Sequence, residues 1–455
     1  MIKKILIANR GEIAVRIIRA CKEMGIDTVA IYSKADEKSL HKELATESVC
    51  IGEARSSDSY LKMENIISAA CLTGCDAIHP GFGFLSENPQ FANMVMKCGL
   101  KFIGPNPVVM EQMGNKSVAI KMMKDAGVSI VPGSYGAVNL QDGKKIANKI
   151  GYPVLIKAAA GGGGKGIRLV ENETDFTPLF KEAKEEAKKF FANSDLYIEK
   201  FIENPKHIEV QVMCDKHGNC LHLFERDCSL QRRKQKMLEE SPCQSISNEL
   251  KEKLYADAIK ACKYVNYDSV GTIEFLVDKE ENYYFIEMNT RVQVEHPVTE
   301  MVTNIDIIKN MIKIADGIEL SLKQEDIKLI GHAIECRINA EDMANDFRPN
   351  PGKISFMHVP GGKGVRIDSG VYTGYEIPAY YDSMILKLIV YAPTRLECIR
   401  KMRASLEELI IDGINTTTEF HYMIMHNPVF IMGNYNTGFI ENFIKELNNN
   451  GKQSI

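Results

Sequence analysis

The chain has 455 residues, of which 45% are hydrophobic and 25% charged, and its formal net charge at pH 7 is −4. These values are typical of a folded globular protein with two or three domains, and the lack of a basic surplus argues against a nucleic-acid partner. No apolar run approaches the roughly 18 residues that a membrane helix needs. Twelve irregularly spaced cysteines do not indicate a disulfide framework, so we expect a cytoplasmic protein without a membrane partner.

Residues 1–113 alternate short apolar strands with helical patterns. Strands are predicted at 5–8 and 28–32 with a helix at 12–24 between them, and the chain begins without a signal pattern. This alternation predicts a doubly wound parallel sheet, in which ligands gather beyond the carboxyl ends of the strands. The loop 80–88 follows such an end. Because no G-x-G-x-x-G turn follows the first strand, we do not expect dinucleotide binding there.

A glycine-rich segment at 161–166 dominates the next part of the chain. It follows a predicted strand that carries Lys157, and Lys116 opens a predicted helix further upstream. The segment fits G-x-G-x-x-G, but a strand at 167–170 follows it where a phosphate-binding loop requires a helix. We therefore predict a strand–loop–strand lid, whose bare amides close over a triphosphate.

Two acidic side chains are predicted to face each other across a hairpin. The strand 270–277 and the strand that begins near 283 flank a polar turn, which places Glu274 opposite Glu287 at about 5 Å. With Asn289 they form an oxygen-rich site that suits Mg²⁺ or Mn²⁺. The alternative is a pair of acids neutralised by lysine or arginine. If the chain stays extended, one face also carries polar side chains at every second position: Arg291, Gln293 and Glu295.

Four potential zinc ligands lie close together in sequence, at Cys214, His217, Cys220 and His222. They flank a polar turn at 215–219 between two runs of strand character. A β-hairpin with incidental cysteine and histidine is therefore the favoured interpretation, and a zinc site is the alternative.

From 331 the chain becomes rich in strands and in Gly/Pro turns. Arg337 lies in a strand of alternating polarity, a helix is predicted at 403–411, and the polar residues after 442 are expected to be loose.

The run FIEMNTRVQVEHPVTE at 285–300 resembles the signature of biotin carboxylases, within the ATP-grasp superfamily. Further matches are ILIANRGEIA at 5–14, YDSM at 381–384 and IIDG at 410–413, so the resemblance covers nearly the whole chain. It implies a three-part α/β and α+β fold. The parts are an N-terminal Rossmann-like domain at 1–113, an ATP-grasp domain at 114–315 with a lid at about 131–203, and a C-terminal β-rich domain at 331–441.

The resemblance implies that bicarbonate and ATP form carboxyphosphate, and that biotin on a carrier protein is then carboxylated. It assigns Arg291, Glu295, Lys236 and Arg337 to catalysis, and Glu274, Glu287 and Asn289 to the metal. Bicarbonate would lie against Lys236, Arg291, Gln293, Val294 and Glu295, and biotin against Arg337 and Phe82. The implied ATP contacts are Lys116, Lys157, Gly163, Gly164, Glu199, Lys200, Phe201, Ile202, His207, Gln231, Lys234, Glu274, Leu276 and Glu287.

Four positions depart from the family pattern. Lys234 replaces a common histidine, Ala160 a glycine, and Phe82 a tyrosine near biotin. Lys363 replaces an aromatic residue of the dimer contact in bacterial relatives. A homodimer is still expected.

The expected partners are a biotin carboxyl carrier protein and carboxyltransferase subunits, because the chain contains no Ala-Met-Lys-Met biotinylation site. Acetyl-CoA, and hence fatty acid biosynthesis, is the first expectation for the downstream acceptor, with pyruvate and propionyl-CoA as alternatives. Another ATP-grasp ligase, such as a carbamoyl-phosphate-type enzyme, and a catalytically silent ATP-binding protein remain rival hypotheses.

Overall fold

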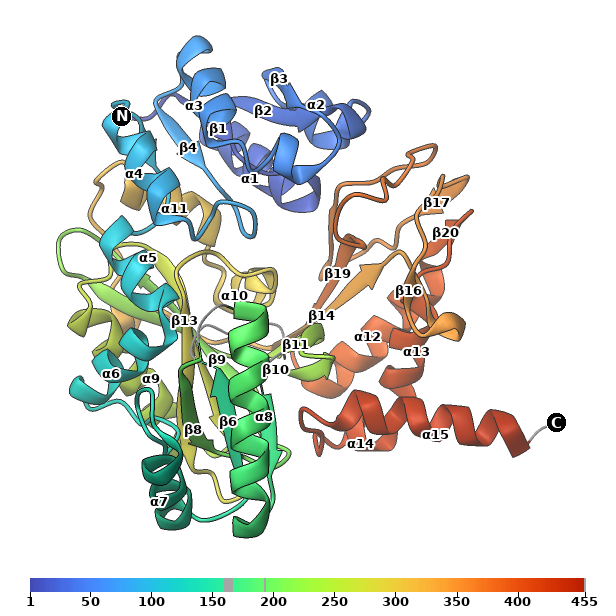
Figure 1. Ribbon diagram of the computed structural model, residues 1–455. Helices are drawn as coiled ribbons and strands as arrows, with labels where there is room; N and C mark the ends of the chain where they lie inside the picture. The colour runs from blue at the N-terminus through green and yellow to red at the C-terminus, as the bar shows by residue number, and fades with distance from the viewer. Residues whose placement is uncertain (159–166, 192–193, 454–455) are drawn as a thin grey trace.

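The computed structural model describes residues 1–158, 167–191 and 194–453 (Figure 1). The N-terminal part is a five-stranded parallel sheet in the order β3-β2-β1-β4-β5, as predicted. Along β1, Ile5 packs in one core with α1, whereas Leu6 packs in another with α3, so both faces of the sheet are covered. Its elements are β1 (Lys4–Ile7), α1 (Gly11–Glu23), β2 (Asp27–Ser33), α2 (Leu40–Leu44), β3 (Glu47–Gly52), α3 (Met63–Leu72), β4 (Ala77–His79), α4 (Pro89–Lys97) and β5 (Lys101–Phe102).

The largest sheet has eight antiparallel strands in the order β13-β12-β9-β10-β11-β14-β19-β18. Strands from the middle of the chain and from its last third meet in this sheet where β11 pairs with β14. The two parts therefore share one hydrogen-bonded layer. Its strands are β9 (Lys206–Cys214), β10 (Cys220–Arg232), β11 (Gln235–Ser241), β12 (Val270–Val277), β13 (Tyr283–Asn289), β14 (His332–Asn339), β18 (Val365–Ser369) and β19 (Met384–Ala392).

A small antiparallel sheet in the order β7-β6-β8 lies at the end of the molecule opposite the N-terminal sheet (Figure 1). It comprises β6 (Val154–Ala158), β7 (Ile167–Val170) and β8 (Leu196–Lys200), with α7 (Leu140–Ile150) and α8 (Glu173–Phe191) packed on it. The pairing of β6 with β7 confirms the predicted strand–loop–strand hairpin. The loop positions Ala160, Gly163 and Gly164 lie outside the described residues.

Two predictions of secondary structure in the last third of the chain were wrong. The helix expected at 403–411 is α12 (Arg395–Glu408), and it is followed by the short strand β20 (Ile410–Asp412). The tail expected to be loose after 442 continues a helix, α15 (Phe439–Gln453), because Phe439, Ile440 and Phe443 anchor its first turns in the C-terminal core. Polar composition alone misled this prediction.

The remaining elements cover the large sheet and complete the C-terminal part. Within the described residues, no helix is long and apolar enough to cross a membrane. These elements are α5 (Pro107–Gly114), α6 (Lys116–Asp125), α9 (Asn248–Tyr264), α10 (His296–Thr303), α11 (Ile307–Ala315), β15 (Glu341–Asp342), β16 (Arg348–Pro349), β17 (Phe356–His358), α13 (Thr418–His426) and α14 (Pro428–Ile431).

Candidate active site

A cleft of about 990 Å³ lies between the large sheet, the ends of the N-terminal strands and the turn that precedes β19. It brings together most of the residues that the sequence singled out. Those lining it are Phe82, His207, Gln231, Lys234, Lys236, Glu274, Leu276, Glu287, Asn289, Arg291, Gln293, Val294 and Arg337.

The two facing carboxylates have different surroundings. Glu274 pairs with Glu287 across β12 and β13, as predicted. Glu274 accepts hydrogen bonds from Lys236 and Asn289, at 2.9 Å each, and its other oxygen lies 3.0 Å from His207 Nε2. Burial alone would raise the pKa of Glu274, but the charge of Lys236 and the contact with His207 hold it well below its usual range.

Glu287 is less well neutralised. Its nearest cation is Lys116, whose Nζ is 4.0 Å away. Burial and the charge of Glu274 raise the pKa of Glu287. Two facing carboxylates, one of which is not fully neutralised by a nearby cation, suit a divalent metal ion. The side chain of Asn289 adds a neutral oxygen beside them.

The expectation that 287–295 forms one extended ribbon was wrong. Strand β13 ends at Asn289, the chain turns, and Glu295 occupies the position before α10. Pro297 in the first turn of that helix favours this change of direction. The side chains still converge, because Arg291 donates to Asn289 Oδ1 at 3.0 Å and to Gln293 Oε1 at 2.8 Å.

Lys236 and Arg337 form a buried ion cluster around Glu295. Lys236 Nζ donates to Glu295 Oε1 at 2.7 Å, and Arg337 Nη2 donates to Glu295 Oε2 at 2.9 Å. Burial would raise the pKa of Glu295, but the charges of Lys236 and Arg337 outweigh it and hold the pKa well below the usual value. Glu295 is therefore ionised throughout the neutral range, with both oxygens held by cations.

Four further residues of the cluster escaped the sequence analysis. Arg226 is fully buried and binds Glu209, which also accepts from Lys236 at 2.5 Å. Glu239 pairs with Arg337, and Glu87 with Arg291 at 2.8 Å. Glu209 alternates with His207 and Gln211 along an otherwise apolar strand, and this pattern was the available signal. Glu239 meets Arg337 only because β11 pairs with the distant β14, and Glu87 lies in the loop before α4, so neither contact has a local signal. Arg226 lies opposite Glu209 in the β9–β10 hairpin, whose register is irregular.

A second group of cations lies toward the small sheet. Asn115 caps α6 by accepting from the Val118 amide, which fixes Lys116 at the first position of the helix. Lys116, Lys157 and Glu199 line a narrow cavity beside the main cleft, where Lys157 pairs with Glu199. Lys234 occupies the two-residue turn between β10 and β11 in the left-handed region, at φ +67°.

Three predicted nucleotide contacts are not among the described residues that line either cavity: Lys200, Phe201 and Ile202. The Lys200 ammonium instead donates to the carbonyls of Gly151 and Tyr152, at 2.9 and 3.0 Å. This ties the end of β8 to the loop before β6.

Comparison with protein families gives three consecutive matches. Residues 1–110 match the N-terminal domain of biotin carboxylase, residues 115–323 the ATP-binding domain of the carbamoyl-phosphate synthase L chain, and residues 335–442 the C-terminal domain of biotin carboxylase. These matches agree with the three-part ATP-grasp architecture expected from the sequence.

Individual proteins are similar over nearly the full length. Biotin carboxylase 1 of Bacillus subtilis (strain 168) is 54% identical over 97% of this chain and 99% of its own. A pyruvate carboxylase subunit from Methanothermobacter thermautotrophicus is 49% identical over 97% of this chain and 90% of its own.

Solved structures agree with this. A biotin carboxylase–ATP complex from Campylobacter jejuni superposes with a TM-score of 0.92 at 52% identity, covering 97% of this chain and 99% of that one. A second similar structure is the biotin carboxylase domain dimer of the Hydrogenobacter thermophilus 2-oxoglutarate carboxylase, in complex with MgADP, ADP and bicarbonate. It superposes with a TM-score of 0.91 at 49% sequence identity and covers 97% of this chain and 98% of that one.

Proposed function

The chain belongs to the biotin carboxylase family, and we propose that its cleft binds ATP, a divalent cation, bicarbonate and carrier-bound biotin through the residues described above. It is an ATP-dependent ligase that carboxylates biotin with bicarbonate. The observation that carries the residue assignment is the convergence of Lys236, Arg291 and Glu295 beside the carboxylate pair Glu274 and Glu287.

The cation site consists of Glu274, Glu287 and Asn289. Mg²⁺ or Mn²⁺ held there would neutralise phosphate oxygens of the nucleotide. Lys116, Lys157 and Lys234 contribute positive charge on the same side. Phosphoryl transfer from ATP to bicarbonate asks the protein mainly for positioning and charge, and this arrangement supplies both.

Bicarbonate lies between Arg291 and Lys236. The planar guanidinium of Arg291 can form two parallel hydrogen bonds with a planar oxyanion, a geometry that lysine cannot reproduce. Gln293 and the backbone of Val294 line the cleft beside it.

Glu295 is the general base for the bicarbonate proton. A carboxylate held by two cations is a weak base, but bicarbonate competes for the same ammonium group of Lys236. Each cation contact that the substrate takes from Glu295 raises the proton affinity of that carboxylate. The substrate thereby activates its own base.

Arg337 stabilises the ureido oxygen of biotin once its nitrogen loses a proton. Its guanidinium is held by Glu239 and Glu295 at the cleft wall, so it is fixed before biotin arrives. Phe82 lines the same cleft and offers an apolar surface to the biotin rings.

The test uses Glu295→Gln and Arg291→Ala, with the exposed Arg233→Ala as control. Loss of the base or of the bicarbonate clamp should lower biotin-dependent ATP turnover by about 10²–10⁴-fold while nucleotide binding, measured by thermal shift, persists. Full carboxylation activity in either variant would refute the assignment. ATP turnover independent of biotin would favour another ATP-grasp ligase, and no turnover in the wild type would favour a silent ATP-binding protein.

We further propose acetyl-CoA as the downstream acceptor, a biotin carboxyl carrier protein and carboxyltransferase subunits as partners, and a cytosolic homodimer. The similar proteins are named as biotin carboxylases, which leaves the acceptor open, and as a pyruvate carboxylase subunit, and a dimer is named for a similar structure. Copurification followed by identification of the biotinylated carrier and its transferase distinguishes the acceptors.

A further inference from the structure

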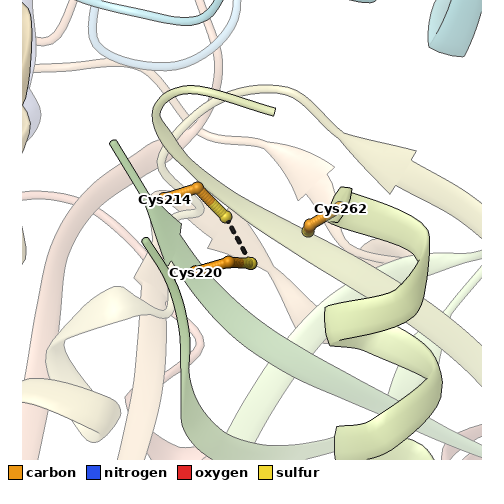
Figure 2. Close-up of side chains that lie close together, drawn as sticks. All are labelled: Cys214, Cys220 and Cys262. Carbon is orange, nitrogen blue, oxygen red and sulfur yellow. Dashed lines mark hydrogen bonds between the residues drawn. The ribbon is translucent and has the colours of Figure 1, made fainter. Parts of the chain in front are cut away.

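Three cysteine thiols meet where the β9–β10 hairpin turns at one end of the large sheet, and none of them lines the cleft. Cys214 ends β9, Cys220 begins β10, and Cys262 projects toward both from α9 (Figure 2). The three sulfur atoms lie within 4.8 Å of one another, and Cys214 Sγ is 2.7 Å from Cys220 Sγ. Cys214 and Cys262 are buried, whereas Cys220 is partly exposed.

This cluster is not the quartet that the sequence suggested. The hairpin interpretation of 215–219 is confirmed, since β9 and β10 pair on either side of that turn. His217 Nε2 bonds the Gly317 carbonyl at 3.0 Å, and His222 stacks on Tyr255. Neither histidine joins the sulfurs. The third ligand, Cys262, is 42 residues beyond Cys220 in sequence, so no local spacing pointed to it.

Strand register holds the first two thiols together. The Asp215 amide donates a hydrogen bond to the Asn219 carbonyl at 3.0 Å, which makes these two residues a hydrogen-bonded pair. Because the two kinds of pair alternate along an antiparallel ladder, the next pair away from the turn, Cys214 and Cys220, is a non-hydrogen-bonded pair. Such pairs have the closer of the two antiparallel spacings, with Cα atoms about 4.5 Å apart and side chains on one face. Helix α9 packs against this face and adds the third sulfur.

The spacing suits a metal ion. A cation with metal–sulfur bonds of about 2.3 Å needs sulfur–sulfur separations of about 3.8–4.0 Å in tetrahedral or trigonal geometry. One separation is 2.7 Å and the other two are no longer than 4.8 Å, so each is within about 1.3 Å of the value that a metal ion needs. The partly exposed Cys220 leaves a path for the ion and room for water as a fourth ligand.

Metal ions bind the deprotonated sulfur, so a bound cation would displace the thiol protons of the cluster.

We propose that Cys214, Cys220 and Cys262 form a structural site for a thiophilic divalent cation of the Zn²⁺ type. The ion would tie the tip of the β9–β10 hairpin to α9. Cys214 is five residues along β9 from Glu209, about 17 Å in a strand, so the ion contributes to stability without entering the chemistry of the cleft.

The experiment titrates the reduced full-length protein with Co²⁺ in excess Mg²⁺, and then displaces the Co²⁺ with Zn²⁺. Wild type should bind one equivalent with a sulfur-to-cobalt charge-transfer band, and Zn²⁺ should raise its Tm. Cys262→Ser and Cys220→Ser should bind at least 100-fold more weakly. Cys71→Ser, an exposed cysteine outside the cluster, should match wild type, and all variants should retain carboxylation activity.

Equal binding by wild type and both cluster variants, or binding without the charge-transfer band, would overturn the proposal. So would a loss of two mass units in untreated wild type and in Cys262→Ser without metal uptake, since that marks a Cys214–Cys220 disulfide. If the buried Cys262→Ser fails to fold, the partly exposed Cys220→Ser decides.

Discussion

The part of the cleft proposed for bicarbonate (the bicarbonate end) and the adjoining region proposed for the nucleotide (the nucleotide end) both carry lysines, but carboxylates neutralise these lysines to different extents. At the bicarbonate end, the side chain of Lys236 is 12% exposed and lies within 2.9 Å of three carboxylates. At the nucleotide end, the side chain of Lys116 is 60% exposed and its nearest acid is 4.0 Å away. Lys234 has no ion pair within the described part of the chain, and burial and the charges of Lys157 and Lys116 lower its pKa.

This difference separates two ways of binding an anion. The bicarbonate end is assembled before substrate arrives, and its cations must be shared with a small anion. At the nucleotide end, the charges of Lys116 and Lys234 are poorly neutralised by protein carboxylates, which favours binding of a polyanion. Buried, saturated ion pairs are costly to break, whereas exposed ones contribute little, so variants at the two ends should behave differently.

The largest effect is expected from Lys236→Met, which leaves Glu209, Glu274 and Glu295 without their shared cation. Unfolding free energy should fall by about 3–5 kcal/mol and carboxylation by about 10³-fold. Lys251→Met is the matched control, because this similarly buried lysine pairs with Glu225 outside the cleft. It should lose stability and keep kcat, which urea unfolding and steady-state assays can check. Equal activity losses in both would mean that Lys236 acts only through folding.

A smaller effect is expected from Lys116→Ala at the nucleotide end. Loss of one partly solvated charge should raise the KM for ATP about 10-fold, which corresponds to about 1.4 kcal/mol of binding free energy. The Tm should remain nearly unchanged. Lys121→Ala, an exposed lysine on the same helix, should change KM less than twofold. Added salt should weaken ATP binding more in wild type than in Lys116→Ala. An identical KM in both variants would remove Lys116 from the ATP site.

A third effect is a pH dependence of stability that originates in Glu239. The pKa of this acid is raised to about 7, mainly by burial. The positive charge of Arg337 lowers the pKa and the negative charge of Glu295 raises it, but burial outweighs the effect of Arg337. Its Oε2 has no partner among the described residues. Between about pH 4.5 and 7 the folded state then binds more protons than the unfolded state, so this group makes stability fall as pH rises.

Glu239→Gln should remove that contribution. From pH 5 to 8 the variant should gain about 1–3 kcal/mol relative to wild type in unfolding free energy. The exposed Glu249→Gln serves as control in the same urea titrations. A pH-independent difference between Glu239→Gln and wild type would show that Glu239 is ionised across this range.

The sequence predicted more of the residues that line the proposed site than of the buried residues that hold them in place. The facing of Glu274 and Glu287 followed from one hairpin turn and strand alternation, and Lys116 and Lys157 from the ends of local elements. The turn after Asn289 did not follow, because the alternating polar residues also fit a strand. Arg226 lies opposite Glu209 in the β9–β10 hairpin, but an irregularity in the register of that hairpin hides the pair from the sequence. Glu239 reaches Arg337 through the pairing of the distant strands β11 and β14, so only the folded sheet reveals it.

The junction of β11 and β14 has a consequence for how the polypeptide can be divided. Because the connection between the middle and the last third is a row of backbone hydrogen bonds inside one layer, severing the chain near 320 would leave each fragment with a bare strand edge. Such fragments should be insoluble when produced separately and should recombine when produced together. The last third of the chain is therefore part of the same sheet that carries the proposed active site, and it is not a detachable domain.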